Sequence, residues 1–399
     1  MSILQGKRIL LGITGSIAAY KAAELTSQLT QMGALVDVIL TPAAEHFITP
    51  LTLQSVAGRP AYTEADLWGG QAHVLHVGLV HSADLLVIAP CTANTAAKLA
   101  HGQADNLLTI TALAARCPLL IAPAMDGGML DHPATQDNLA RLAQRRAVIA
   151  GPAEGHLASG LSGKGRMLEP SEIVGHIRLV LGRQGRLNGR KVVVSAGGTQ
   201  EPLDPVRVLT NRSSGKQGYA LAQAAIDAGA EVVLVSAPSA LTPPVGAHLV
   251  PAATAEDMRT AILQASAGAD ALIMAAAVAD FRPKKATAEK IKSRDGVPHV
   301  ELEATEDVLM AVAKGKRPRV VVGFAAESRD LAGNASAKLK AKALDFIVAN
   351  DISAADAGFG TDTNRVTIID AAGKTEALPL ASKAEVAELI IARVAALLE

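Results

Sequence analysis

The sequence contains little cysteine, few aromatic residues and no long apolar run. Only Cys91 and Cys117 occur among 399 residues, which is too few for a disulfide framework and favours a reducing cytoplasmic compartment. No run approaches the roughly 18 apolar residues that a membrane span needs, and no charged-then-apolar leader predicts secretion. Because aromatic residues make up 2% of the chain, Ala, Val, Leu and Ile must fill the cores. We therefore expect a cytoplasmic α/β protein without a membrane partner.

An excess of charge of one sign is also missing. The 38 basic and 38 acidic residues give a formal net charge of zero, which argues against nucleic acid as a main partner. The length allows two or three domains, each with its own core.

Short apolar runs alternate with longer helical patterns along the chain. This alternation predicts parallel sheets covered by helices on both faces. The stretch LGRQGRLNGRK, at 181–191, lacks apolar periodicity and is typical of a solvated linker. We predict two tandem Rossmann-like domains, at 1–182 and 191–399, joined by a linker at 183–190. The expected strands lie at 9–13, 35–40, 85–89, 119–122, 192–195, 231–235, 271–275, 320–324 and 345–349.

A dinucleotide-binding glycine motif is absent from the first strand exit. The spacing is Gly12-x-x-Gly15 rather than G-x-G-x-x-G, and the second strand ends at Thr41 rather than at an acid for a ribose diol. A nicotinamide oxidoreductase is therefore a distant alternative. A mononucleotide phosphate needs only hydroxyls and backbone amides, which Gly15, Ser16 and Thr41 offer.

Two later strand exits carry further candidate ligand residues. VIAPCTANT, from Val87, places Pro90, Thr92 and Thr95 where open α/β sheets bind ligands. The alternative for this stretch is an ordinary strand exit with a Thr/Asn helix cap. APAMDGGM, from Ala122, is a second glycine-rich exit.

The second half repeats the pattern of strand, glycine turn and helix. In NRSSGKQG, from Asn211 on, hydroxyls, amides and a lysine form an anion cradle without Walker spacing, although a capped helix start is the alternative. A lysine cluster at 284–292 follows the small-residue strand at 271–275. It predicts a solvated loop or a loop that grips phosphate. Lys338 and Lys342 share one helix face.

The first half resembles the homo-oligomeric flavin-containing cysteine decarboxylases, because GSI, PCTANT, ADNLL and PAMDGGM occur in order at strand ends. The resemblance implies a flavodoxin-like domain in which FMN accepts a hydride from the carbon that bears a cysteine thiol, so that carbon dioxide leaves. It places His76 beside the flavin as a catalytic residue. The implied FMN contacts are Gly15, Ser16, Ile17, Thr41, Phe47, Pro90, Thr92, Asn94, Thr95 and Met125.

Two residues depart from this family. Asp126 stands where the family has asparagine, and Ser159 stands where the pantothenoyl enzymes carry a proton-donating cysteine. Serine is a far weaker acid than a thiol. We therefore hypothesise that Asp126, held protonated beside the substrate carboxylate, is the acid that Ser159 cannot be.

The second half resembles phosphopantothenate–cysteine ligases, and the fused order resembles that of bifunctional bacterial enzymes of coenzyme A synthesis. The resemblance implies that 4′-phosphopantothenate attacks CTP to give an acyl-cytidylate, and that L-cysteine then displaces CMP, with Mg²⁺ assisting. Asn211 and Lys290 would be catalytic. Phosphopantothenate would contact Arg207, Asn211, Ser213, Ser214, Gly215 and Lys216. CTP would contact Met274, Ala275, Ala276, Asp280, Lys290, Glu306, Asp307, Val308, Phe324, Lys338 and Lys342.

The ligase product would then be decarboxylated to 4′-phosphopantetheine by the first half. The families imply a large homo-oligomer that combines trimers with dimers, as a dodecamer for example. Two alternatives remain open. The first half could be an inactive oligomerisation scaffold beside a monofunctional ligase, or the chain could be a binding or regulatory flavoprotein.

Overall fold

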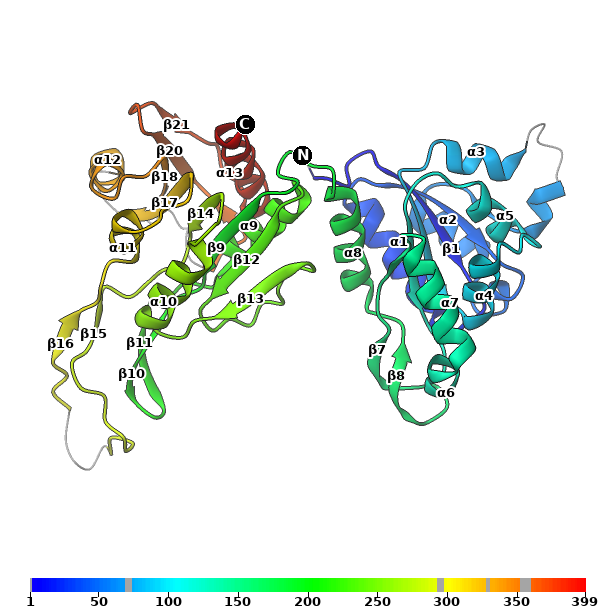
Figure 1. Ribbon diagram of the computed structural model, residues 1–399, viewed down its shortest axis with the longest axis horizontal. Helices are drawn as coiled ribbons and strands as arrows, with labels where there is room; N and C mark the ends of the chain where they lie inside the picture. The colour runs from blue at the N-terminus through cyan, green and yellow to red at the C-terminus, as the bar shows by residue number, and fades with distance from the viewer. Residues whose placement is uncertain (1, 69–73, 293–297, 328–330, 352–359) are drawn as a thin grey trace. The chain divides into compact units, whose positions relative to one another are not determined.

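The computed structural model describes residues 2–68, 74–292, 298–327, 331–351 and 360–399. The chain divides into two compact units, Met1–Leu181 and Gly182–Glu399, each with its own sheet (Figure 1). Residues 183–190, where the sequence predicts a linker, pack within the second unit. Leu187 is buried there, and its amide donates to the Ala228 carbonyl at 2.7 Å.

The sheet of the first unit is parallel, in the order β3-β2-β1-β4-β5-β6. Without the short β3 the order is that of flavodoxin, and with it the order is that of a Rossmann fold. The strand bounds are β1 (Arg8–Ile13), β2 (Leu35–Leu40), β3 (Ala61–Tyr62), β4 (Leu85–Cys91), β5 (Leu119–Pro123) and β6 (Val148–Ile149).

Helices cover both faces of this sheet because side chains alternate along its strands. Ile9, Leu11 and Ile13 of β1 join the core under α1 (Lys21–Gln31), α2 (Pro50–Ala57) and α8 (Pro170–Gly182). Leu10 joins the opposite core. That core lies under α3 (Leu75–His81), α4 (Ala93–His101), α5 (Leu107–Ala114) and α7 (Pro133–Gln144). Shorter elements are η1 (Ile17–Tyr20), η2 (Ala44–His46), η3 (Glu64–Trp68), α6 (Gly127–Asp131) and the hairpin of β7 (Ala153–His156) and β8 (Ser162–Arg166).

The sheet of the second unit has the order β13-β12-β9-β14-β17-β18-β20-β21. The expected parallel pairing holds from β13 to β18, but β20 and β21 pair antiparallel at the edge, since a four-residue turn at 371–374 joins them. The bounds are β9 (Lys191–Ala196), β12 (Glu231–Ser236), β13 (Ala247–Pro251), β14 (Ala271–Met274), β17 (Val320–Glu327), β18 (Phe346–Asp351), β20 (Val366–Asp370) and β21 (Thr375–Ala377).

One face of this sheet packs on α10 (Ala255–Ser266), α11 (Val308–Lys314) and α12 (Leu331–Ala341). The helices α9 (Lys216–Asp227) and α13 (Lys383–Leu398) pack against each other, and α9 also contacts β9 and β12. Two antiparallel ribbons extend from the sheet and contact each other through β10 and β15 (Figure 1). They are β10 (Gln200–Asp204) with β11 (Arg207–Thr210), and β15 (Phe281–Pro283) with β16 (Leu302–Ala304). The short pair β19 (Thr363–Asn364) and β22 (Ala381–Ser382) precedes α13.

Buried hydroxyl groups join the strand exits at the point where each strand order reverses. In the first unit, the Thr14 hydroxyl donates to the Pro90 carbonyl at 2.8 Å and accepts the Thr92 amide at 3.1 Å, so the exits of β1 and β4 are fixed together. In the second unit, the Ser195 hydroxyl accepts the Ala276 amide at 3.0 Å, which joins β9 to the exit of β14. Ligands of open α/β sheets bind at such points. Within the described residues, no helix is both long and apolar enough to cross a membrane.

We expect Thr14→Val to destabilise the first unit by about 1–3 kcal/mol, because the buried Pro90 carbonyl and the part-buried Thr92 amide would lose their partner. Urea unfolding of the full chain, followed by hydrogen exchange in β1 and β4, measures this loss. Thr26→Val is the matched control, since the equally buried Thr26 hydroxyl donates only to the Ala22 carbonyl of its own helix. Equal losses in the two variants would contradict the bridging role of Thr14.

Candidate functional sites

A pocket of about 620 Å³ lies at the carboxyl edge of the first sheet. Ser16 and Ile17 reach it from the exit of β1, Met125 and Asp126 from the exit of β5, and Ser159 from the β7–β8 hairpin. The structure thus brings together five of the residues that the sequence assigns to flavin binding and decarboxylation.

The two residues that depart from the family pattern are in direct contact. The Ser159 hydroxyl donates to Asp126 Oδ2 at 2.7 Å, and the Gly128 amide donates to Oδ1 at 3.0 Å. The Ser159 hydroxyl, and then the Gly128 amide, lower the pKa of the Asp126 carboxyl. The protein by itself therefore favours ionised Asp126. The expectation that a neighbouring substrate carboxylate keeps Asp126 protonated stays a prediction.

Most other predicted flavin contacts lie at the same edge but do not line this pocket. Gly15 follows β1, and a Cβ there would lie 2.5 Å from the Ala43 Cβ. Thr41 directly follows β2, which ends at Leu40, and its hydroxyl donates to the Ile13 carbonyl at 3.3 Å. Phe47 is 47% exposed. The β4 exit contributes Pro90, Thr92, Asn94 and Thr95, of which Thr92 caps α4 and Asn94 is exposed.

His76 is the second residue of α3 and does not line the pocket. A helix that precedes a parallel strand begins near the carboxyl edge of the sheet, so the topology places His76 toward the predicted flavin side. Its Nδ1 atom is buried and has no hydrogen-bond partner among the described residues. Such an atom is costly to bury unless a ligand or water pairs with it.

The sequence analysis did not identify two cationic residues that line this pocket, Lys21 and Arg166. The ammonium of the buried Lys21 lies 2.8 Å from Glu169 Oε1, and the Arg166 guanidinium lies 2.8 Å from the same oxygen. Both residues line the pocket. Lys21 lies in AAYKAAEL, where an amphipathic helix is the obvious interpretation, and Glu169 is 148 residues away.

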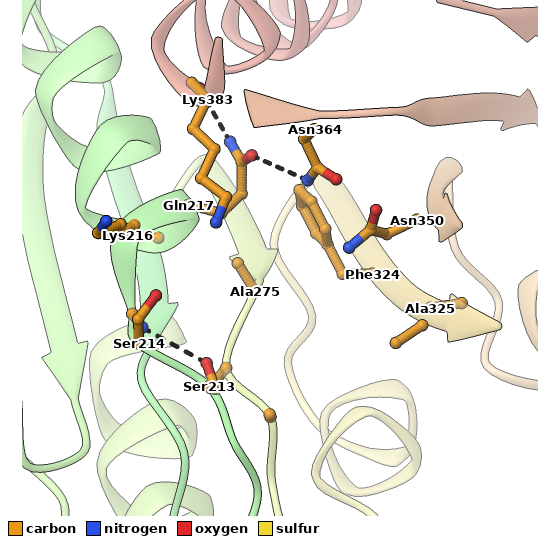
Figure 2. Close-up of a pocket in the computed structure, with 15 residues that line it drawn as sticks. Ser213, Ser214, Lys216, Gln217, Ala275, Phe324, Ala325, Asn350, Asn364 and Lys383 are labelled. Atoms are coloured by element: carbon orange, nitrogen blue, oxygen red, sulfur yellow. Dashed lines mark hydrogen bonds between the residues drawn. The ribbon is translucent and has the colours of Figure 1, made fainter. Parts of the chain in front are cut away.

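A smaller pocket, of about 130 Å³, lies at the switch point of the second sheet (Figure 2). It joins two groups of predicted residues. The SSGK turn before α9 supplies the phosphopantothenate group, Ser213, Ser214, Gly215 and Lys216. The exit of β14 supplies Ala275 and Ala276 of the CTP group, and β17 supplies Phe324.

Polar residues from α9 and from the C-terminal part complete this pocket, and the sequence analysis did not assign them to a site. They are Gln217, Asn350, Asn364 and Lys383, which Figure 2 shows around Phe324 and Ala275. Lys383 is 7% exposed, and its ammonium donates to the Thr361 carbonyl at 2.6 Å. Its position could have been noticed, because SKAE predicts a capped helix start, where a lysine opposes the helix dipole.

Charges around this pocket are coupled. Lys216 forms an ion pair with Asp362 at 2.6 Å, and its ammonium lowers the pKa of that carboxyl. Burial, and then the nearby Lys216, lowers the pKa of Lys383, whereas Asp362 opposes that shift. Two lysines and one carboxylate therefore give the pocket a positive balance.

Arg207 and Asn211 lie outside this pocket, on and just after β11. The Asn211 amide donates to the carbonyls of Ala277 and Val278, at 3.2 and 3.3 Å, so it touches the β14 exit. Arg207 is paired with the buried Asp204. Lys290 and Asp280 are exposed and do not line the pocket.

A separate cluster forms at the start of α11. Asp307 caps the helix and pairs with Lys342 at 2.8 Å, whereas Glu306 pairs with Arg259 at 3.2 Å. Val308 is buried, Lys338 is exposed on α12, and Met274 is buried at the end of β14. The structure therefore divides the predicted CTP contacts between the pocket, this cluster and the Lys290 segment. Among the described residues, no three His, Cys, Asp or Glu side chains gather closely enough to hold a metal ion.

Comparison with known proteins gives the class of each half. The flavoprotein family model matches residues 2–182, and the model of the DNA/pantothenate metabolism flavoprotein C-terminal domain matches residues 187–398. The chain is therefore a flavoprotein that carries a pantothenate-metabolism domain.

Curated relatives identify the family within this class. The coenzyme A biosynthesis bifunctional protein CoaBC of Bacillus subtilis is 45% identical over 99% of this chain and 98% of its own length. That of Vibrio cholerae is 44% identical, with 98% of each chain covered. A crystal structure of a CoaBC C-terminal domain is 39% identical, covers 54% of this chain and 98% of its own, and has a TM-score of 0.47. The chain belongs to the family of coenzyme A biosynthesis bifunctional proteins.

This membership confirms two predictions from the sequence. One is the family, and the other is that the chain is a bifunctional enzyme of coenzyme A biosynthesis, with a decarboxylase half and a ligase half. The α/β fold class is confirmed by the sheets. The scaffold alternative for the first half is not favoured. The roles of the individual site residues stay predictions.

We expect Asp307→Asn to cost about 0.5 kcal/mol of stability at neutral pH, because asparagine keeps the helix cap but loses the partly exposed ion pair with Lys342. Burial opposes ionisation of Asp307, but Lys342 and the Met310 amide outweigh it and lower the pKa. Its contribution is therefore present above the unfolded pKa, about 4, and is lost as the pH falls through the lower folded value.

Guanidinium unfolding of the wild type and the Asn variant, from neutral pH down to about pH 3, checks this prediction. The difference between the two proteins should vanish at the acid end. A difference that stays constant with pH would refute the ionic contribution.

Proposed function

We propose that the two halves catalyse consecutive steps. The second unit joins L-cysteine to 4′-phosphopantothenate through an acyl-cytidylate made from CTP. The first unit decarboxylates the product to 4′-phosphopantetheine with FMN. The observation that carries the ligase step is the pocket at the second switch point, where the SSGK turn faces Ala275, Ala276 and Phe324. Acyl transfer requires that the binding sites for the phosphate and for the nucleotide lie next to each other.

The SSGK turn is the proposed seat of the phosphopantothenate phosphate. Helix α9 begins there, so backbone amides and the helix dipole favour an anion. Lys216 supplies one positive charge. Lys383, which the sequence analysis did not identify, supplies a second. Asp362 holds Lys216 and keeps the two ammonium groups compatible.

CTP would lie over the exits of β14 and β17. Asn350 lines the pocket, and its Oδ1 atom is buried without a hydrogen-bond partner among the described residues, so an N–H group of the ligand would satisfy it. Asn211, held against the β14 exit, would orient the acyl carbonyl. Lys290 would stabilise the charge that develops on the transferring phosphate.

Mg²⁺ would enter with the triphosphate. This ion keeps several waters and binds proteins through one or two carboxylates together with substrate phosphates. The described residues fit that mode rather than a cage of protein ligands.

The sheet edge around the first pocket suits a flavin in its chemistry. Ile17 and Phe47 are large apolar side chains that are 58% and 47% exposed at the sheet edge, and a planar ring would cover them. FMN would supply the hydride acceptor for the carbon that bears the thiol. Gly15 and Ser16 would hold its phosphate, and the buried Nδ1 atom of His76 offers a further polar contact.

Asp126 and Ser159 would act at the cysteine end of the substrate. The substrate carboxylate would oppose ionisation of Asp126, which the protein alone favours. Asp126 would then hold a proton beside the carbon that carbon dioxide leaves, and Ser159 would orient the carboxyl. Lys21 and Arg166 would attract the anionic substrate.

We also propose a large homo-oligomer in the cytoplasm, with trimeric and dimeric contacts combined. Trp68 and Leu113 are 86% and 64% exposed, and neighbouring copies would cover such apolar side chains.

The full chain, loaded with FMN and given CTP, L-cysteine and 4′-phosphopantothenate, tests the proposal. Pyrophosphate and carbon dioxide are followed separately, and pyrophosphate should form first. Failure to release pyrophosphate would overturn the ligase assignment. Pyrophosphate without carbon dioxide, from yellow protein, would overturn the decarboxylase assignment alone.

Lys290→Gln should slow pyrophosphate release by about a hundredfold or more, because one charge on the transferring phosphate is lost. CTP affinity, measured by calorimetry, should stay within about threefold, since ground-state contacts remain. Lys284→Gln is the matched control, because Lys284 lies on the same segment and pairs with Glu301 at 3.1 Å. An unchanged rate in Lys290→Gln would remove this residue from the mechanism.

Asp126→Asn should release carbon dioxide but accumulate the unsaturated thiol, because the amide oxygen can accept from Gly128 and the NH₂ group can donate to the Ser159 hydroxyl, yet the amide cannot supply the proton. Mass spectrometry of the thiol products distinguishes the two forms. Ser159→Ala, which leaves the carboxyl in place, should lose far less saturated product. Undiminished saturated thiol from Asp126→Asn would rule out the acid role.

A further inference from the structure

The ribbon β10–β11 ends in a buried carboxylate that the ligase chemistry above does not use. The Asp204 side chain is 0% exposed, although its ribbon and the facing Lys290 segment lie at the surface. We propose that Asp204 is a positioning residue of the ligase step, which holds Arg207 and the backbone beside Lys290 in one fixed arrangement. The proposal rests on the proposed roles of Arg207 and Lys290.

The two carboxylate oxygens of Asp204 accept hydrogen bonds from different groups. Oδ1 accepts the amides of Val206 and Arg207, at 2.9 and 2.8 Å, and so closes the turn between β10 and β11. Oδ2 accepts the Arg207 guanidinium at 2.6 Å and the Ile291 amide at 3.1 Å. One carboxylate therefore joins the ribbon turn, a proposed substrate-binding arginine and the residue next to Lys290.

Arg207 doubles this connection. Its Nη1 atom also donates to the Ile291 carbonyl at 2.9 Å, so the amide and the carbonyl of Ile291 are both bound by the Asp204–Arg207 pair. A second attachment lies four residues before Ile291 in the sequence, where the Thr287 amide donates to the Leu203 carbonyl at 3.0 Å. The segment that carries Lys290 is thus fixed to the ribbon at two points.

Only an ionised carboxylate suits all four donors. Burial opposes the ionisation of Asp204, but the amides of Val206 and Ile291 and the Arg207 guanidinium outweigh it and lower the pKa. An asparagine could offer one oxygen to these donors, and its NH₂ group would face an N–H group. The geometry therefore depends on the charge as well as on the shape of the side chain.

The consequence for catalysis is that the Lys290 main chain is ordered before the substrates bind. The Lys290 ammonium remains exposed and able to reach a phosphate. Without Asp204, ordering the segment would cost conformational entropy during each turnover, and small displacements of a catalytic group slow a reaction strongly.

The test compares Asp204→Asn, Lys290→Gln and the double variant in the full chain. We expect Asp204→Asn to lower kcat of pyrophosphate release at least about tenfold, with KM for CTP within about threefold. In the Lys290→Gln background the same substitution should cost clearly less, because both act on one step. Full multiplication of the two effects would show a merely structural role and overturn the proposal, as would an unchanged kcat.

Glu201→Gln is the matched control. Glu201 lies on the same strand, is 2% exposed and accepts the Ala255 amide at 2.8 Å, but it contacts neither Arg207 nor Ile291 among the described bonds. It should lower stability and leave kcat within about threefold of the wild type. An equal loss of kcat in Glu201→Gln would overturn the proposal.

Hydrogen exchange at 287–291 separates this inference from the proposed function. Exchange should become faster in Asp204→Asn and in Ile291→Pro, which removes the amide donor without altering the ribbon. Unchanged exchange in Ile291→Pro overturns the positioning role even if Asp204→Asn fails to fold. If Lys290→Gln leaves pyrophosphate release unchanged while exchange responds as expected, the catalytic role of Lys290 is wrong. The attachment of its segment to the ribbon through Asp204 is then still supported.

Discussion

Buried hydroxyl groups that join two neighbouring strand exits are the contacts on which both sites depend. Parallel strands end at one edge of a sheet, but loops that leave in opposite directions would separate without a link. Thr14 supplies that link in the first unit and Ser195 in the second. Since each hydroxyl is buried, the link is not exchanged for water, and the surrounding turns start from a fixed geometry. The two pockets proposed for the ligands lie at these two edges.

Much of the fold follows from local sequence patterns. The apolar runs at 35–40 and 231–235 coincide with β2 and β12 almost residue for residue, because a strand buried on both faces leaves a continuous apolar run. The antiparallel edge of β20 and β21 and the two ribbons could not be read in this way. The strands β11, β15 and β21 are short and mostly exposed, and tertiary contacts rather than periodicity decide their pairing.

The site residues also differ in whether a local sequence pattern predicts them. The SSGK turn and the exits of β1, β4 and β5 have recognisable motifs, since hydroxyl and glycine residues after an apolar run mark a strand exit. Lys383 and Asp204 have none, because their importance comes from partners far away in the sequence. The Asp204–Ile291 bond spans 87 residues. Asp126 was recognised from the sequence as unusual, but its contact with the Ser159 hydroxyl, 33 residues away, which lowers the pKa of the carboxyl, could not be predicted from the sequence.

The central claim is that each sheet edge binds a different ligand, flavin at the first and CTP at the second. Hydrogen exchange of the full chain with FMN alone and with CTP alone tests the claim most directly. The account predicts that FMN protects the exits of β1, β2 and β4, and that CTP protects the exits of β14 and β17 together with the start of α11. Protection of the first set by CTP, or of the second set by FMN, would contradict it.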